Sequence, residues 1–276
     1  MFSVELYSES EKFNVNNLPD YFPDSSWVRS VCTSGDRYSE ICDHYGTNRW
    51  LPLHPFYSTD YLVRIPLSES DLSSLKRIGQ IRCSSGRDLR SDDIEDFSDE
   101  LISQLNKAVF KLGKVFVRMT HKSTKNSFSR KLCFCSTVLD ILDSLTSSIP
   151  LLKTLNSPFQ EIILMKWVII DPKTEYRVFI IDYKLVGISQ QHCYTTFGPR
   201  DVLPDAEKIL EWYQSVRDKF IELNYSIATL DLYVNEKVNL IEVNPPSLWG
   251  PSGSSLFTEK EMVDLPSRDY ITVKIR

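Results

Sequence analysis

The segment "LDLYVNEKVNLIEVNPP", Leu230 to Pro246, contains two apolar runs. A short polar stretch joins the two runs, and two prolines end the second one. Residues two apart on a strand point to the same face, so Glu242 and Asn244 direct their side-chain oxygens to one side of the second run. Mg²⁺ prefers oxygen ligands and often shares them with substrate phosphates. The segment predicts a β-hairpin with a metal site near its end or, as the alternative, a strand that emerges into solvent.

The register of this hairpin decides whether a third ligand joins the first two. We place a two-residue turn at Asn235-Glu236, which sets Asp231 opposite Leu240 and diagonal to Glu242. Asp231 then shares a face with Glu242 and Asn244, while the apolar residues between them face a core. A change of one residue in the loop length would turn Asp231 to the other face.

The bulk composition is that of an ordinary globular chain. Its 276 residues are 42% hydrophobic and 25% charged, which suits one large domain or two lobes. The net charge of −5 gives no footprint for non-specific binding to nucleic acid or membranes. The sequence shows no signal-peptide pattern and no run of about 18 apolar residues. Six cysteines without a CxxC pair favour reduced thiols, so we expect a cytoplasmic protein. We also expect it to be a monomer.

Periodicity and turn residues predict an α+β protein with antiparallel hairpins rather than a parallel, doubly wound sheet. Helices are expected at 68–79, 94–113, 136–145 and 203–223, with Ser68 as an N-cap and with Gly79 and Gly113 as helix stops. Strands are expected at 61–67, 114–119, 130–135, 161–170, 175–190 and 226–243, the last two ranges being hairpins. Residues 1–60 lack a clear period and are expected to pack on the core as a divergent segment.

Basic residues recur between residues 114 and 177. Lys166 lies within the apolar run "IILMKWVII" and Arg177 within "TEYRVF", where a charge is costly unless it is paired or reaches solvent. Arg118 lies in "VFVRM", and Lys122 and Lys125 follow in the next loop. Each cation alone indicates a surface residue, but with the acidic hairpin they predict a cleft for a polyphosphate and its metal. The absence of GxxxxGK[ST] and GxGxxG argues against a P-loop or Rossmann site.

The ordered segments resemble the cell division cycle protein 123 family, a eukaryotic branch of the ATP-grasp superfamily. They are "YLVRIPL", "KAVFKLGKVFVRMTHKSTKNS", "IILMKWVIIDPKTEYRVFIIDYKLVGISQ", "LDLYV", "NLIEVNPP" and "LFTEKEM", in the family's order between residues 61 and 262. The most specific parts are Glu175-Tyr176-Arg177 followed by "LVGISQ", and the final Asp with Glu-x-Asn-Pro. The resemblance implies a two-lobed ATP-grasp-like fold with antiparallel sheets and an ATP cleft between the lobes, which would span 61–160 and 161–276.

The resemblance also implies roles for individual residues. Asp231, Glu242 and Asn244 would hold Mg²⁺. Contacts to ATP would come from Arg118, Lys125, Lys166, Trp167, Val168 and Arg177, with Lys166 to Val168 as the hinge that meets the adenine and the arginines near the phosphates. The sequence departs from the family at several points: Thr124-Lys125-Asn126-Ser127 replaces Pro-Arg-Asp-Ala, Gln191-His192 replaces Arg-Asp, Met165 replaces an arginine, and Glu242 replaces an aspartate.

The function that the resemblance implies is an ATP- and Mg²⁺-binding factor that promotes assembly of translation initiation factor 2 through its gamma subunit. An ATP-grasp ligase, which joins a carboxylate to an amine or thiol through an acyl phosphate, is the alternative. No arginine for its acceptor pocket can be assigned, so catalytic residues are unknown. A third interpretation is a domain that has lost ATP, against which the retained metal residues argue.

The segment "SLWGPSGSSLFTEKEM", residues 247–262, follows the predicted metal site directly. Its large apolar residues are Leu248, Trp249, Leu256 and Phe257. They either pack back on the lobe, which is the more common outcome, or form a recognition patch for a partner.

Overall fold

The computed structural model describes residues 1–6, 43–53, 60–129, 133–156, 160–192, 195–198, 200–245, 255–257 and 259–276. They fall into two compact units. The N-terminal unit contains the described residues of 43–52 and 60–169, and the C-terminal unit contains those of 170–276 with Leu53 and the first strand. The lobe boundary expected at 160 precedes this division, because the strand that begins at Glu161 pairs within the N-terminal unit. Most of the expected N-terminal segment, 7–42 and 54–59, lies outside the described residues.

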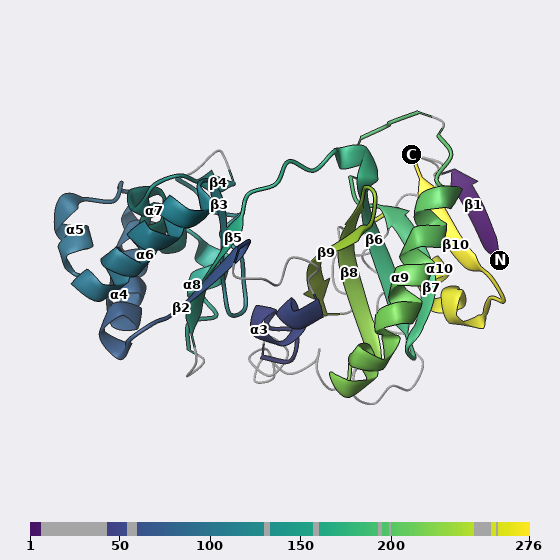
Figure 1. Ribbon diagram of the computed structural model, residues 1–276, viewed down its shortest axis with the longest axis horizontal. Coiled ribbons are helices and arrows are strands. Elements are labelled where there is room, and N and C mark those ends of the chain that lie inside the picture. Colours follow the sequence, from purple (N-terminus) through teal and green to yellow (C-terminus); the bar gives the residue numbers. More distant parts are fainter. Residues whose placement is uncertain are drawn as a thin grey trace. The chain divides into compact units, whose positions relative to one another are not determined.

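The N-terminal unit is a four-stranded antiparallel sheet whose helices between residues 69 and 152 cover one face, while the short helix at 47–50 lies against the other (Figure 1). The strand order is β2 (Leu62–Pro66), β5 (Glu161–Lys166), β3 (Val115–Met119), β4 (Phe134–Cys135). The helices are α3 (Thr47–Trp50), η3 (Leu51–Leu53, whose last residue groups with the other unit), α4 (Glu69–Ser85), α5 (Ser91–Glu95), α6 (Asp99–Leu112), α7 (Val138–Thr146) and α8 (Ile149–Leu152). Alternate strand residues such as Val117 and Leu164 join the helices in one apolar core.

Helix ends in this unit follow the capping residues with one exception. The Ser68 hydroxyl accepts a hydrogen bond from the Asp71 N–H, and Gly113 ends α6, as predicted. The prediction that Gly79 stops the first helix is wrong, since α4 continues to a left-handed Gly86. Gly79 is buried inside the helix, where a β-carbon would lie 2.4 Å from a methyl of Leu152. Its role is close packing rather than termination.

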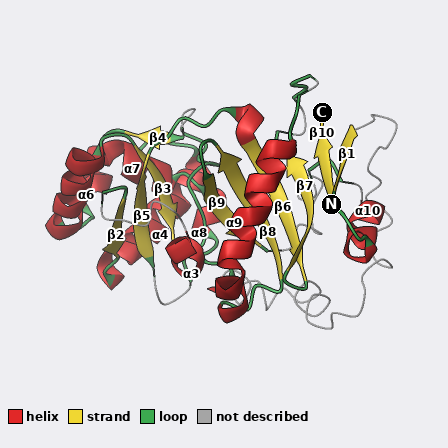
Figure 2. Cartoon of the chain, turned by 45° about the vertical axis from the view of Figure 1, so that its right-hand side comes forward, coloured by secondary structure: helices red, strands yellow, loops and turns green. Residues whose placement is uncertain are grey.

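The C-terminal unit is a six-stranded sheet (Figure 2). Its order is β1 (Phe2–Leu6), β10 (Ile271–Ile275), β7 (Lys184–Gln190), β6 (Glu175–Ile181), β8 (Ile227–Val234), β9 (Val238–Asn244). The four strands from β7 to β9 are antiparallel, whereas β1, β10 and β7 pair in parallel. The remaining elements are η4 (Pro172–Thr174), α9 (Leu203–Glu222), α10 (Glu259–Asp264) and η5 (Leu265–Ser267).

The two faces of this sheet are covered differently. The long helix α9 lies along one face (Figure 2), and its Asp205 accepts a hydrogen bond from the hydroxyl of Tyr176 at 2.6 Å. Tyr176 and Arg177 are neighbours on β6, so Arg177 points to the opposite face. On that face Phe257 packs edge-on against Phe179 and close to Gly187.

The segment after the β8–β9 hairpin therefore packs back on the sheet where it is described. Leu256 and Phe257 are 2% and 3% exposed, and the Leu256 N–H donates to the Ser189 hydroxyl. This is the more common of the two outcomes considered for the apolar residues of 247–262. Leu248 and Trp249 lie outside the described residues.

The β8–β9 hairpin differs from the predicted one in two ways. Val234 pairs with Val238, so the loop has three residues instead of the predicted two. A β-bulge then follows, because Leu232 pairs with Leu240 while Asp231 pairs with Glu242. With the longer loop alone, Asp231 and Glu242 would lie on opposite faces of the hairpin. The extra residue in β9 brings them back to the same face. The predicted pairing of Asp231 with Leu240 is wrong, but the predicted common face of Asp231 and Glu242 is present.

Within the described residues, no helix is both long enough and apolar enough to cross a membrane.

Candidate functional site

A row of polar side chains crosses the middle of the C-terminal sheet on the face away from α9. Arg177 pairs with Asp231 across β6 and β8, and Asp231 pairs with Glu242 across β8 and β9. Directly paired residues present their side chains to the same face. Asn244 pairs with Thr229 one step further along the same face. The sheet therefore brings together Arg177 and the three residues predicted to hold a metal.

The Arg177–Asp231 pair is the best-defined contact of this row. The guanidinium donates through Nε to Asp231 Oδ1 at 2.8 Å and through Nη2 to Oδ2 at 3.0 Å, a two-point geometry. The side chains are 13% and 4% exposed. Asn244 Nδ2 donates a third hydrogen bond to Asp231 Oδ2 at 3.1 Å. The arginine expected at the phosphates is thus bound to the carboxylate expected at the metal.

These contacts leave Asp231 able to coordinate a hard cation. A carboxylate offers about four acceptor positions, and the three hydrogen bonds to Asp231 leave its Oδ1 with room for one further ligand. Glu242 is buried beside it at 9% exposure. In the described part of the chain, no group of three His, Cys, Asp or Glu residues could hold a metal. A metal here would therefore rest on two carboxylates and the Asn244 amide, an oxygen donor set that suits Mg²⁺.

The row extends beyond the predicted residues toward the other edge of the sheet. Arg177 pairs with Ser189 on β7, Ser189 with Lys274 on β10, and Lys274 with Glu5 on β1. Lys274 is 3% exposed and forms an ion pair with Glu261 of α10. Ser189 and Lys274 could not be placed beside Arg177 from the sequence, because the parallel pairing of β7, β10 and β1 joins segments from both ends of the chain.

The same motif contains a tyrosine with a structural role. Burial and the hydrogen bond to the Asp205 carboxylate raise the pKa of Tyr176, because both favour the neutral phenol. Tyr176 therefore stays protonated and anchors β6 to α9, which fixes the direction of Arg177.

In the N-terminal unit, Arg118 is buried rather than presented at a surface. It is 2% exposed, its Nε donates to the Thr47 hydroxyl at 3.3 Å, and its guanidinium lies 5.1 Å from the centre of the Trp50 ring. Both partners belong to α3. This contact could not be predicted from local patterns, because Arg118 and Thr47 lie 71 positions apart in the sequence.

The predicted hinge residues begin where β5 ends. Lys166 is the last residue of the strand and is exposed, so the prediction that it lies inside a strand is wrong. Its ammonium lies 5.4 Å from the centre of the Tyr61 ring, and its backbone N–H donates to the Tyr61 carbonyl. Val168 is 40% exposed, and Lys125 is exposed in the loop after β3.

Trp167 belongs to an aromatic cluster on the N-terminal sheet. Its ring centre lies 6.4 Å from that of Phe116 and 5.7 Å from that of Phe134. The Lys114 ammonium lies 4.3 Å from the centre of the Phe134 ring. Phe116, Phe134 and Lys114 were not predicted as site residues. Their alternation on neighbouring strands was the signal that could have placed them beside Trp167.

Comparisons with known proteins match this architecture. The structure of Cdc123 from Schizosaccharomyces pombe superposes with a TM-score of 0.64 at 17% identity, covering 86% of this chain and 97% of that one. Cell division cycle protein 123 of Candida glabrata is 24% identical over 285 residues, 87% of this chain and 78% of that protein. A "Translation initiation factor eIF2 assembly protein" of Candida albicans is 29% identical over 198 residues, 62% of this chain and 54% of that protein. The chain thus spans about half the length of this last relative.

The fold is accordingly the α+β fold with antiparallel hairpins predicted from the sequence, and it is the fold of the Schizosaccharomyces pombe Cdc123 structure. The family model described as D123 matches residues 82–276, and the chain belongs to this family. The resemblance to the cell division cycle protein 123 family is confirmed.

Proposed function

We propose that the chain is an ATP- and Mg²⁺-binding assembly factor that acts on translation initiation factor 2 through its gamma subunit. The observation that carries the proposal is the family match over residues 82–276, which includes every residue predicted for nucleotide and metal. The proposed partner is suggested by relatives that bear the name eIF2 assembly protein. The Arg177–Asp231–Asn244 contacts support the metal, because they fix oxygen donors in one place.

For the metal, Asp231, Glu242 and Asn244 are the proposed ligands. Bound Mg²⁺ would neutralise phosphate oxygens of the nucleotide. Arg177 would then have a double role, since it holds Asp231 by two hydrogen bonds and brings a positive charge next to the metal. Its contact with Asp231 holds the carboxylate in a fixed orientation.

For the nucleotide, Lys166, Trp167, Val168 and Lys125 are the proposed contacts in the N-terminal unit. Lys166 and Lys125 are exposed, and Trp167 offers an aromatic face within its cluster. Arg118 is the weakest of the proposed contacts, because its guanidinium already lies against Thr47 and Trp50.

A thermal-shift experiment tests nucleotide binding directly. A ligand that binds only the folded chain raises its stability, so ATP with Mg²⁺ should raise the melting temperature more than ATP with EDTA. The matched control is Asn244→Ala, in which the difference between the two conditions should shrink. Equal shifts with and without Mg²⁺ would remove the metal from the proposal.

A pull-down with purified gamma subunit tests the partner, with the alpha subunit as the control protein. Capture of gamma but not alpha is expected. Release of ADP that a small amine or thiol acceptor stimulates, together with no capture of gamma, would replace the assembly factor by the ligase.

A further inference from the structure

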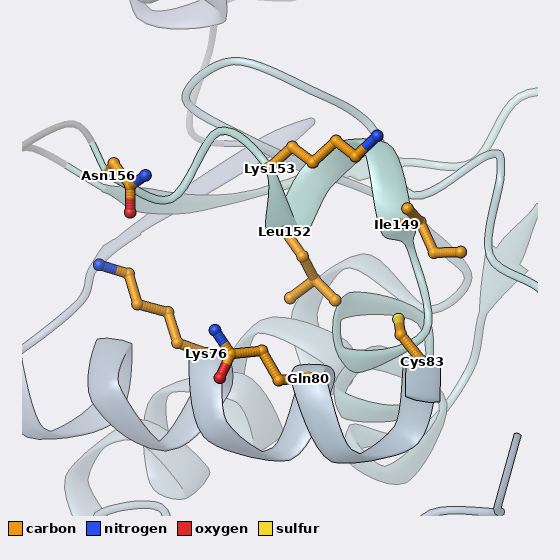
Figure 3. Close-up of a pocket in the computed structure, with 7 residues that line it drawn as sticks. All are labelled: Lys76, Gln80, Cys83, Ile149, Leu152, Lys153 and Asn156. Atoms are coloured by element: carbon orange, nitrogen blue, oxygen red, sulfur yellow. The ribbon is translucent and has the colours of Figure 1, made fainter. Parts of the chain in front are cut away.

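A pocket of about 300 Å³ lies in the N-terminal unit between α4 and α8 (Figure 3). None of its lining residues belongs to the site described above. Ligand pockets in proteins begin at about this size, which suits a molecule of roughly a dozen non-hydrogen atoms. The pocket is therefore a candidate binding site in its own right.

One end of the pocket is polar. Figure 3 shows Lys76, Gln80 and Asn156 on one side of Leu152. They supply an ammonium and two amides, all of which can donate hydrogen bonds. Among the described residues that line the pocket, there is no aspartate or glutamate. This end is complementary to one negative charge with hydrogen-bond acceptors.

The other end is mainly apolar, with the ammonium of Lys153 toward the same side. Figure 3 shows Ile149 and Cys83 on the far side of Leu152. Burial raises the pKa of the Cys83 thiol, against a smaller opposing effect of the Arg82 charge. The thiol therefore stays neutral near pH 7 and adds to the apolar surface. Ile149 is 46% exposed, so apolar surface stands open at this end.

The shape of the pocket depends on a glycine in the helix below it. Lys76, Gln80 and Cys83 follow each other at helical spacing on one face of α4, beside Gly79. Because Gly79 has no side chain, Leu152 approaches the helix axis, where a β-carbon would lie 2.4 Å from Cδ2 and 2.7 Å from Cδ1. Glycine costs about 1 kcal/mol in a helix relative to alanine. The close approach that it permits seats Leu152 as the floor between the two ends.

We propose that this pocket binds a monoanionic carboxylate with a short apolar chain. The carboxylate lies against Lys76, Gln80 and Asn156, and the chain runs over Leu152 toward Ile149 and Cys83. A single ammonium at the polar end suits one charge better than the two charges of a phosphate monoester. The ammonium of Lys153, which the view shows toward the Ile149 side, adds favourable charge without a second anchor.

Cys83 provides the measurement. Octanoate is the probe, octylamine is its cationic counterpart, and the rate of alkylation by iodoacetamide is followed at Cys83 by peptide mass spectrometry. Exposed Cys133 is the internal reference. We consider a millimolar octanoate concentration at which about nine-tenths of the pockets are occupied. The rate of alkylation at Cys83 should then fall about tenfold, while the rate at Cys133 stays unchanged. Octylamine should leave both rates unchanged.

Two variants locate the contact. Lys76→Gln should abolish the protection by octanoate, whereas Lys107→Gln, a change at an exposed lysine on α6, should keep it. Equal protection by octylamine, equal slowing at Cys133, or no slowing at all would each overturn the proposal. Because the readout involves neither ATP nor the gamma subunit, its failure would leave the proposed function untouched.

Discussion

The two units hold their charged site residues in opposite ways. In the C-terminal unit Arg177 and Asp231 are strand partners, and two hydrogen bonds join their side chains. In the N-terminal unit Arg118 is buried against Thr47 and Trp50, while Lys166 is exposed at a strand end. The strand partner of Arg177 is an aspartate, whereas that of Arg118 is Ile163, so the Arg118 guanidinium packs against α3 instead. Lys166 lies at a strand end, where a long side chain reaches solvent. In the C-terminal unit, strand pairing therefore holds the charged side chains together. In the N-terminal unit, one basic side chain is buried against an aromatic ring and the other is exposed.

The strongest test of this difference breaks the Arg177–Asp231 pair. Asp231→Ala leaves a mostly buried guanidinium without its carboxylate, so we expect a loss of about 3–5 kcal/mol in the free energy of unfolding. Urea unfolding measures the size of this loss. Hydrogen exchange of the β8 and β9 amides shows whether the loss arises in the C-terminal unit.

The double variant Arg177→Met/Asp231→Leu is the control for this loss. It removes both charges at similar volume and should recover most of the stability. A double variant as unstable as Asp231→Ala would mean that the pair is not what stabilises the sheet.

Arg118→Ala should have the next largest effect. It removes a hydrogen bond and a cation–aromatic contact from a buried position, so we expect a loss of about 2–3 kcal/mol. Hydrogen exchange of the β3 amides should report it, and those of β8 should not. A loss under about 0.5 kcal/mol would indicate that the guanidinium behaves as a surface group.

Glu242→Ala and Asn244→Ala should affect binding more than stability. Each removes one proposed oxygen ligand, so each should weaken Mg-ATP at least tenfold, about 1.4 kcal/mol. Isothermal titration calorimetry measures this, with Asn106→Ala at an exposed position of α6 as a matched asparagine control. Unchanged affinity in both variants would assign these residues to a solvated polar face.

Lys166→Ala should have the smallest effect. Because its side chain is exposed, we expect a change in unfolding free energy under about 0.5 kcal/mol. Loss of its proposed contact to ATP should weaken ATP binding about two- to fivefold. Lys122→Ala should weaken ATP binding less. Equal effects of the two variants on the ATP titration would show that the hinge is misplaced.

The α+β class could be predicted from the sequence because apolar periodicity and capping residues act locally. Ser68 and Gly113 cap their helices as predicted. Gly79 does not, since its role depends on Leu152, a residue far away in the sequence. The strand expected at 161–170 ends at Lys166 instead, because an apolar run does not show where strand pairing ends.

The site could be predicted only in part for the same reason. The common face of Asp231 and Glu242 was predicted, although the loop length was wrong and a bulge compensated for it. Bulges leave no clear mark in a single sequence. Ser189 and Lys274 join the polar row through parallel pairing, which short-range patterns do not reveal.

The bulge in β9 also has an evolutionary consequence. The pairs on either side of the bulge are Leu232–Leu240 and Asp231–Glu242, so Ile241 adds length to β9 without a partner on β8. Loss of Ile241 would leave both pairs in place, and Asp231 and Glu242 would keep their common face on a regular ladder. A deletion within β8 would instead shift Asp231 away from both Arg177 and Glu242. Among members of this family, length changes should therefore be tolerated between residues 240 and 242 of β9 and absent from β8.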